Sequence, residues 1–123
     1  MDLTVIILSF NTKDLLKDCL TSIFDKKWKY KIKVLMIDNY SSDESVGMVN
    51  KCFPQVDIIE SDKNLGFAGG NNLGLKNLNS KYALLLNSDT KVMEGSLDNL
   101  IDFMDTSDYG IASCKLIDGE GKF

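Results

Sequence analysis

The chain has 123 residues, 44% of them apolar and 26% charged, a balance typical of one globular domain and unlike that of a disordered chain. All fourteen basic residues are lysines and the net charge is −4, which argues against a dedicated nucleic-acid-binding protein. Without histidine, His-based triads and histidine metal sites are excluded, and without arginine an anion has to be held by metal ions, backbone N–H groups or helix N-termini.

Apolar runs alternate with segments of helical period along the chain. The runs predict strands at residues 3–8, 32–37, 56–60, 82–86 and 111–114. Helices are predicted at residues 12–24, around 45–52, from the glycine-rich stretch to about 78, and around 97–104. Thr12 stands where the first of these helices needs an N-cap. This alternation predicts an α/β fold, with a mainly parallel sheet flanked by helices on both faces.

Polar residues follow each of the first four predicted strands. These segments read SFNT, DNYSSD, SDKNLGFAGG and NSDT. Ligands of parallel α/β sheets collect beyond the carboxyl ends of the strands, so these four segments predict a ligand-binding edge.

Asp38 and Asn39 follow the second predicted strand directly. A carboxylate there can accept a hydrogen bond from a ribose hydroxyl or from the ring N–H of a pyrimidine. The alternative is a turn aspartate that caps the next helix, a role for which Asp43 is better placed. We therefore expect Asp38 to bind ligand and Asp43 to cap.

The glycine-rich segment at residues 64–74 lies between the third predicted strand and a helix. Gly66 and Gly69 would let a ligand approach the backbone, and the helix N-terminus favours an anion. Asn71 and Asn72 are poor helix formers, which favours a role in ligand contact. The spacing fits neither a dinucleotide fingerprint nor a P-loop, and a flexible loop with helix-packing glycines is the alternative.

Asn87, Ser88 and Asp89 follow the fourth predicted strand. A carboxylate at this position can hold a hard divalent cation that bridges a diphosphate. An Asx-type turn with Asp89 as a helix cap is the alternative.

Other features predict ordinary structural roles. Residues 26–33 (KKWKYKIK) are expected to be an exposed connection with solvated lysines, rather than a basic aromatic patch. Cys19, Cys52 and Cys114 lack metal or redox spacing and lie in apolar patterns, so reduced, buried thiols are expected. No segment has transmembrane length or the pattern of a signal peptide, which predicts a cytoplasmic chain, with peripheral attachment to the inner face of the membrane left open.

Taken together, the four segments resemble the family 2 glycosyltransferases, which have the GT-A fold. LSFNT at 8–12 and IDNYSSD at 37–43 are similar to the signatures of the family's first two strands. NLGFAGGNN at 64–72 and LLNSDT at 85–90 are similar to the rhamnosyltransferase-like branch. The resemblance runs from about residue 3 to about residue 119 and implies a Rossmann-like GT-A half-domain over residues 1–123.

The resemblance also implies roles for single residues. Phe10 and Asn11 fall where the base and ribose bind, and Asp38 matches the carboxylate that binds a uracil or thymine ring. Asn87 to Asp89 match the DxD motif, whose last aspartate coordinates Mn²⁺ or Mg²⁺ on the donor diphosphate. The first position of that motif is Asn87 instead of aspartate, and Asn71 stands where many members have arginine.

The implied activity is transfer of a sugar, with inversion, from a UDP- or dTDP-linked donor to a hydroxyl of a glycan or lipid-linked acceptor in polysaccharide synthesis. Because the family's domain is longer than this chain, we expect a donor-binding half, truncated at its C-terminus, that lacks the catalytic base and is inactive alone. Pairing into a homo-oligomer through an uncovered apolar face is also open.

Three other functions fit parts of the sequence. A receiver-type signalling domain has similar length and alternation, but it needs an acidic pair after its first strand, where this chain has Ser9, Phe10 and Asn11. A sugar-nucleotide-forming nucleotidyltransferase needs a glycine-rich loop after that strand, and SFNTKD has no glycine. A non-catalytic nucleotide-binding or oligomerisation module is the third.

Overall fold

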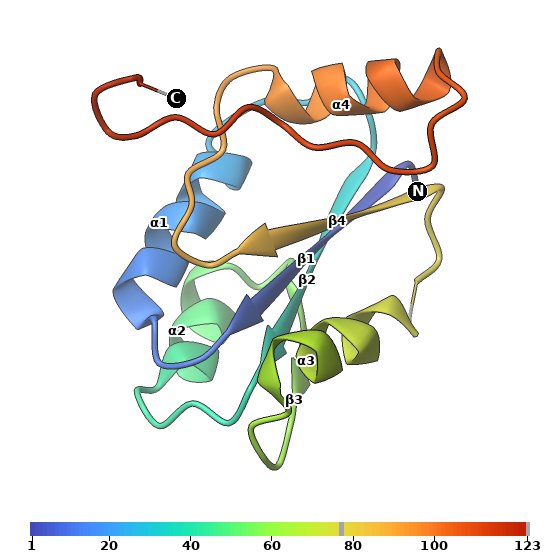
Figure 1. Ribbon diagram of the computed structural model, residues 1–123. Coiled ribbons are helices and arrows are strands. Elements are labelled where there is room, and N and C mark those ends of the chain that lie inside the picture. The colour runs from blue at the N-terminus through green and yellow to red at the C-terminus, as the bar shows by residue number, and fades with distance from the viewer. Residues whose placement is uncertain (77, 123) are drawn as a thin grey trace.

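The computed structural model describes residues 1–76 and 78–122 and shows a four-stranded sheet with helices on both faces (Figure 1). In chain order the elements are β1 (Leu3–Ser9), α1 (Lys13–Phe24), β2 (Ile32–Asp38), α2 (Ser45–Cys52), β3 (Asp57–Glu60), α3 (Gly66–Leu75), β4 (Tyr82–Asn87) and α4 (Ser96–Asp105). The strand order is β3-β2-β1-β4, and every pairing is parallel, as the alternation predicted.

Strand β1 is apolar along most of its length because it has a strand on each side and helices on both faces. Val5, Ile6 and Ile7 are fully buried. Its register places Ser9 opposite Asp38 of β2 and Leu8 opposite Asn87 of β4. The carboxyl ends of these three strands therefore lie at one edge of the sheet.

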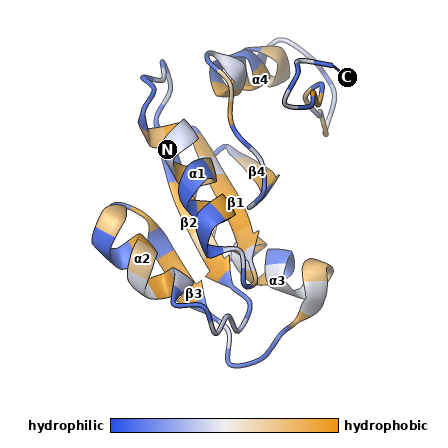
Figure 2. Cartoon of the chain, turned by 90° about the vertical axis from the view of Figure 1, so that its left-hand side faces the viewer, coloured by the Kyte–Doolittle hydropathy of each residue, from blue (hydrophilic) through white to orange (hydrophobic). Residues whose placement is uncertain are grey.

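The two faces of the sheet have separate hydrophobic clusters. On one face, β1 and β2 residues such as Val5 and Met36 pack with α1, α2 and the α4 residues Leu97 and Ile101. On the other face, α3 and the residues after it pack on Ile6 and Ile37 of the two central strands. Figure 2 shows the apolar strands between the helices.

The predicted fifth strand at residues 111–114 is wrong. None of the described residues from Thr106 to Lys122 lies in a helix or strand, and Ile111 is 90% exposed. The segment borders the same groove as β4 without entering the sheet. A run of only four residues, two of them the poor strand formers Ala112 and Ser113, does not compensate for the entropy of ordering a new edge strand.

The glycine-rich segment differs from the loop that was predicted, since it forms α3 itself. A Cβ on Gly70 would lie 2.3 Å from Leu8 Cδ1, and one on Gly74 would lie 2.8 Å from Ile6 Cγ2. These two glycines let the helix approach the sheet closely, which is the helix-packing role given above as the alternative. The helix ends at Leu75, before the predicted end near residue 78, and residue 77 lies outside the described residues.

The cysteine prediction holds only for Cys19. All three thiols are free, but Cys52 and Cys114 are exposed. Cys52 is the last residue of α2 and lies on its solvent side, and Cys114 lies in the segment that was expected to be a buried strand.

The connection at residues 26–33 is more ordered than an exposed linker. Trp28 donates through its indole N–H to the carbonyl of Ile23, and Lys29 forms an ion pair with Asp102 of α4. Lys27, Lys31 and Lys33 are exposed, as expected. The described residues contain no helix that is long and apolar enough to cross a bilayer.

Candidate functional site

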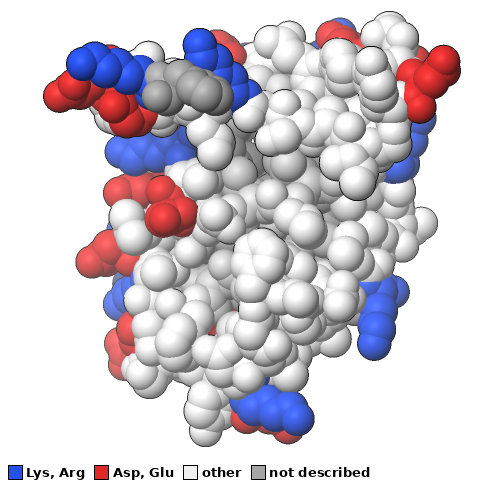
Figure 3. Space-filling model, in the orientation of Figure 1, with Lys and Arg blue, Asp and Glu red and all other residues white. Residues whose placement is uncertain are grey.

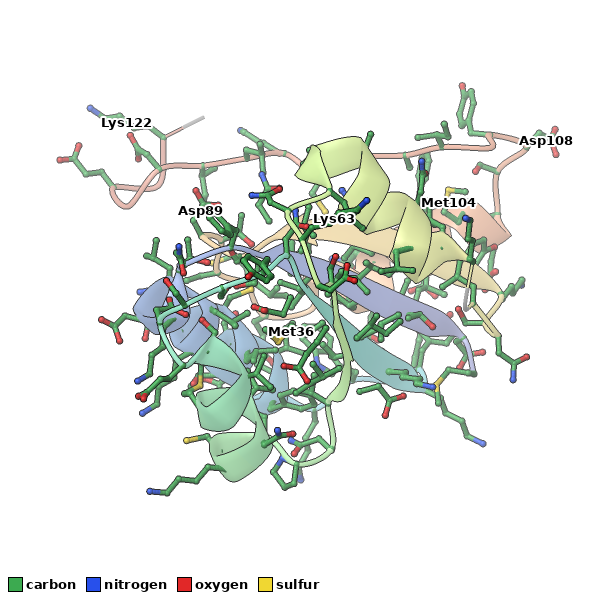
Figure 4. All side chains as sticks on the ribbon, turned by 90° about the horizontal axis from the view of Figure 1, so that it is seen from below. Met36, Lys63, Asp89, Met104, Asp108 and Lys122 are labelled. Carbon is green, nitrogen blue, oxygen red and sulfur yellow. The ribbon has the colours of Figure 1, made fainter. Side chains whose placement is uncertain are left out.

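Three strand ends form the candidate site. Asp38 ends β2 and Asn87 ends β4, and both lie beside the end of β1. Two interstrand spacings separate β2 from β4, which corresponds to about 10 Å between their backbones. In Figure 4, the labelled Asp89 lies just beyond the end of β4. One ligand of nucleotide size can span this distance.

Asp38 is a buried carboxylate with one unused oxygen. Its side chain is only 4% exposed, and its Oδ2 accepts a hydrogen bond of 3.0 Å from the N–H of Ser41. Among the described residues, Oδ1 has no hydrogen-bond partner, although it is buried. An unpartnered buried polar atom costs roughly 1–3 kcal/mol, which makes this oxygen a candidate acceptor for a ligand. Because the atom is covered, a ligand reaches it only if adjacent loop residues shift.

The loops after β1 and β2 are joined by hydrogen bonds. The N–H of Asn39 donates to the carbonyl of Ser9 at 2.8 Å. The N–H of Asn11 donates to Ser41 Oγ at 2.9 Å, and Asn11 Oδ1 accepts from the N–H of Ser42 at 2.8 Å. Asn11 and Tyr40 both have positive φ, of 52° and 73°, a strained conformation that clusters at functional sites.

The Asn39 side chain holds the start of α3. Its Oδ1 accepts from the N–H of Leu65 at 2.7 Å, and its Nδ2 donates to the carbonyl of Gly66 at 3.2 Å. Gly66 has φ +74°, which favours glycine there. The predicted ligand residue Asn39 thus uses both ends of its amide within the chain, and it fixes the helix N-terminus beside Asp38.

The other predicted α3 residues lie on different sides of the helix. Gly69 is half-buried, Asn71 is 5% exposed and Asn72 faces solvent. Only the early part of α3 is at the strand-end edge, so the structure brings Gly66 close to Asn39 while Asn71 is enclosed.

The segment from Asn87 to Thr90 is a tight turn. The N–H of Thr90 donates to the carbonyl of Asn87 at 3.3 Å, and its Oγ1 donates to the same oxygen at 2.8 Å. Ser88 is buried, and its hydroxyl shares a 2.8 Å hydrogen bond with Thr12. Asp89 is exposed and accepts no hydrogen bond within the described part of the chain. The turn therefore anchors one side chain and leaves the next carboxylate for solvent or a ligand.

This donor set fits a cation that arrives with a ligand. Across residues 1–76 and 78–122, no group of three or more His, Cys, Asp or Glu side chains is arranged to hold a metal. Asp89 alone supplies one carboxylate oxygen donor. Mg²⁺-type ions are often bound by one or two carboxylates together with substrate phosphates and water, so a single carboxylate fits that mode of binding.

Asp43 bonds the first N–H groups of two helices, although Glu44, and not Asp43, occupies the N-cap position of α2. Its carboxylate accepts from the N–H groups of Lys13 at 3.0 Å and of Ser45 at 3.1 Å, the first residues of α1 and α2, and also from the Ser45 hydroxyl. Partial burial raises the pKa of Asp43, but these hydrogen bonds outweigh that effect and leave the pKa below its ordinary value. Thr12 occupies the N-cap position of α1, as predicted, but its side chain makes no capping hydrogen bond.

Two features of the edge were not identified from the sequence. Ser41 bonds the Asn11 N–H, and Thr12 bonds Ser88. The partners are 30 and 76 residues apart, and no local pattern signals such pairs. Phe10, by contrast, was a predicted site residue, and its ring is 46% exposed at the tip of β1.

A hollow lies along β4 and reaches this edge at Thr90. An open groove of about 550 Å³ runs along β4 and is bordered by α4 and residues 111–116. Its lining is mainly apolar and includes neither Asp38 nor Asp89. The polar groups of the strand-end edge distinguish it from the groove.

Comparison with known proteins gives consistent results. Residues 4–123 match the model of the family described as Glycosyl transferase family 2. The chain is 26% identical over 124 residues to the low-salt glycan biosynthesis hexosyltransferase Agl10 of Haloferax volcanii, covering 98% of this chain and 38% of that protein. The chain thus spans well under half the length of this relative.

Solved glycosyltransferase structures share the fold. S. aureus TarS 1-349 in complex with UDP-GlcNAc superimposes with a TM-score of 0.78 at 22% identity, over 85% of this chain and 31% of that one. The mannosyltransferase PcManGT from Pyrobaculum calidifontis, in complex with GDP-Man and Mn²⁺, gives 0.75 at 20% identity, over 83% and 32%. With an all-parallel sheet of GT-A type and a family match over nearly its whole length, the chain belongs to glycosyl transferase family 2.

Proposed function

We propose that the strand-end edge binds the nucleotide of a nucleotide-diphosphate sugar, as the donor site of a glycosyltransferase. The observation that carries this proposal is that two carboxylates lie at one edge of the sheet. Asp38 is buried and has one oxygen without a partner, and Asp89 is exposed and has no partner in the described chain. The complexes of TarS with UDP-GlcNAc and of PcManGT with GDP-Man and Mn²⁺ support it.

Each part of the donor has a matching part of the edge. Asp38 Oδ1 accepts a hydrogen bond from the imide N–H of a uracil or thymine ring, and the exposed ring of Phe10 lies at the tip of the adjacent strand. The diphosphate lies at the N-terminus of α3, where the helix dipole favours an anion, although the N–H groups of Leu65 and Gly66 already donate to Asn39 and Asn64. These contacts with the base and the diphosphate need no arginine, and the chain contains none.

Asp89 holds a divalent cation, Mn²⁺ or Mg²⁺, on the diphosphate. When bound, such a cation offsets the phosphate charge and stabilises the departing nucleoside diphosphate. Because Asp89 is the one carboxylate of this turn, we expect the cation to bind weakly without nucleotide and tightly with it.

The reaction is sugar transfer with inversion in glycan or polysaccharide synthesis. An acceptor hydroxyl loses its proton to a carboxylate base and bonds to the anomeric carbon, while the bond from that carbon to the diphosphate oxygen breaks. We place the base outside these 123 residues, so this chain binds donor without transferring sugar. The motifs at 64–72 and 85–90 favour a thymidine-linked rhamnose donor.

A thermal-shift panel tests the proposal. UDP, dTDP and GDP are each added with and without Mn²⁺, and Mn²⁺ is also added alone. Ligands that bind the folded state raise Tm, so we expect a rise with UDP or dTDP that requires Mn²⁺. Asp89→Ala should abolish the Mn²⁺-dependent rise in Tm, whereas Asp108→Ala, which removes an exposed carboxylate beyond α4, should not. A flat panel for all three nucleotides would refute the proposed function.

A further inference from the structure

Three hydroxyl groups link the two halves of the candidate site. Ser9 Oγ and Thr12 Oγ1 are 3.2 Å apart, and Thr12 Oγ1 and Ser88 Oγ are 2.8 Å apart. Ser9 ends β1, Thr12 precedes α1, and Ser88 belongs to the turn after β4. Ser9 and Ser88 are both buried, so this hydroxyl chain runs beneath the edge.

The Thr12 hydroxyl forgoes the partner that its position usually provides. A threonine at an N-cap normally accepts a hydrogen bond from an N–H in the first turn of its helix. Thr12 makes no such bond, and the first N–H of the helix, that of Lys13, donates to the Asp43 carboxylate. The hydroxyl of Thr12 is thereby left for Ser88, which lies 76 residues further along the chain.

Helix α1 holds the turn after β4 at two points. Besides Thr12, the Cys19 thiol lies 3.9 Å from the carbonyl of Asn87 and 3.9 Å from Thr90 Oγ1. Thr12 and Cys19 are two helical turns apart and so share a face of α1. Their contacts fix the turn from below, and Asp89 is exposed, as is Asn87.

We propose that Thr12 is a positioning residue, which holds the Asp89 turn in register with the loop that carries Phe10 and Asn11. Thr12 does not touch the ligand. It fixes the spacing between the part of the edge that binds the nucleoside and the part that binds the cation and diphosphate. This inference rests on the proposed function.

A positioning role and a purely structural role have different consequences for ligands. If the hydroxyl chain only satisfies buried polar groups, its loss lowers stability and affects all ligands alike. If the hydroxyl chain sets the spacing of the two halves, its loss lowers the affinity for ligands that span both halves and leaves the affinity for ligands of one half unchanged.

The test compares a spanning ligand with a ligand for one half. UDP and dTDP with Mn²⁺ are the spanning probes, titrated by calorimetry, and uridine and thymidine are the probes for the nucleoside half, titrated by chemical-shift changes. Thr12→Val removes the hydroxyl at nearly constant shape, and Thr12→Ser keeps it. Thr21→Val is the matched control, because within residues 1–76 and 78–122 the Thr21 hydroxyl bonds only the Lys17 carbonyl, on the exposed side of α1.

We expect Thr12→Val to lower the affinity for UDP and dTDP with Mn²⁺ by about tenfold and to leave the affinity for the nucleosides unchanged. A tenfold change corresponds to the loss of one hydrogen bond that holds a positioned group. Thr12→Ser should restore most of the affinity, and Thr21→Val should match the wild type. Ser88→Ala removes the same hydrogen bond from the other side and should reproduce the effect if Thr12→Val does not fold.

The other outcomes are distinct. Wild-type affinity for the diphosphates in Thr12→Val would overturn the positioning role and leave the proposed function intact. Equal loss for nucleoside and diphosphate, or failure of both variants to fold, would mean a structural role and would also overturn it. A wild-type chain that binds neither UDP nor dTDP would contradict the proposed function itself.

Discussion

Asp38 and Asp43 lie five residues apart and use their carboxylates in opposite ways. Both oxygens of Asp43 accept hydrogen bonds from residues at the starts of α1 and α2, whereas Asp38 keeps Oδ1 free. The sequence predicted this division because Asp38 follows an apolar run directly and Asp43 precedes a helix. It could not predict that Ser41 would occupy only one oxygen of Asp38, since that depends on the path of the loop.

The first prediction concerns the different reactivities of the Cys19 and Cys52 thiols. Burial raises the pKa of Cys19 to about 11, with an opposing contribution from the Thr90 hydrogen bond and a further raise from the charge of Asp89. Only the thiolate reacts with iodoacetamide, so at about pH 8 the native chain should be alkylated at exposed Cys52 while Cys19 stays unmodified until denaturant is added. Peptide masses after a short pulse report this, and equal rates for the two thiols in the native chain would contradict it.

At the scale of elements, the sequence predicted the type and place of four strands and four helices, because hydrophobic period and length agree for each. The prediction was wrong for two segments whose structure depends on how they pack against the sheet. The glycine-rich segment was expected to let a ligand approach the backbone, but Gly70 and Gly74 serve close contact between α3 and β1, and only the first turn of the helix reaches the edge. The run at residues 111–114 looked like a strand, but it does not pair with the open edge of β4, although it lies beside that strand.

The packing of α3 gives the second prediction. In Gly74→Ala the new Cβ would lie 2.8 Å from Cγ2 of Ile6, whose side chain is fully buried. The cost of this overlap exceeds the gain in helix propensity, so we expect the free energy of unfolding to fall by roughly 1–2 kcal/mol. Gly47→Ala in α2 is the control, because nothing lies within 4 Å of its Cβ, and it should stabilise by about 0.5–1 kcal/mol. Urea unfolding measures both, and a stabilising Gly74→Ala would show that the helix can move off the sheet.

The attachment of α4 gives the third prediction. Hydrogen bonds from Tyr30 and Lys29 lower the pKa of Asp102, and those from Lys81 and Tyr82 lower the pKa of Asp105. A carboxylate with a lower pKa when folded stabilises the fold above its unfolded pKa, about 4, and this stabilisation is lost as pH falls through the folded pKa.

We therefore expect the double variant Asp102→Asn, Asp105→Asn to lose less stability than the wild type between neutral pH and about pH 3. Urea midpoints at the two pH values measure the difference. Asp108→Asn, an exposed carboxylate beyond α4, should keep the wild-type pH dependence. Equal loss in the double variant and the wild type would mean that these solvent-exposed pairs do not anchor the helix.

At the scale of the whole molecule, polar and apolar surfaces are separated. Figure 3 shows a broad face with few charged side chains and a rim of Lys, Asp and Glu. Exposed apolar side chains near the open edge of β4 include Leu85, Met93, Ile111 and Leu116. The polar strand-end edge is where we propose that a nucleotide binds, and the order of the strands predicted that these polar tips would lie together.

The most direct test of this account is where a nucleotide-bound Mn²⁺ lies on the folded chain. In ¹⁵N-labelled protein with UDP or dTDP, a trace of Mn²⁺ broadens the amide signals of nearby residues. The account predicts broadening at Asn87 to Thr90 and at Asn11, with sharp signals at the opposite strand ends, such as Leu3 and Ile32. Broadening centred on the acidic residues of α4, or none that depends on nucleotide, would contradict it.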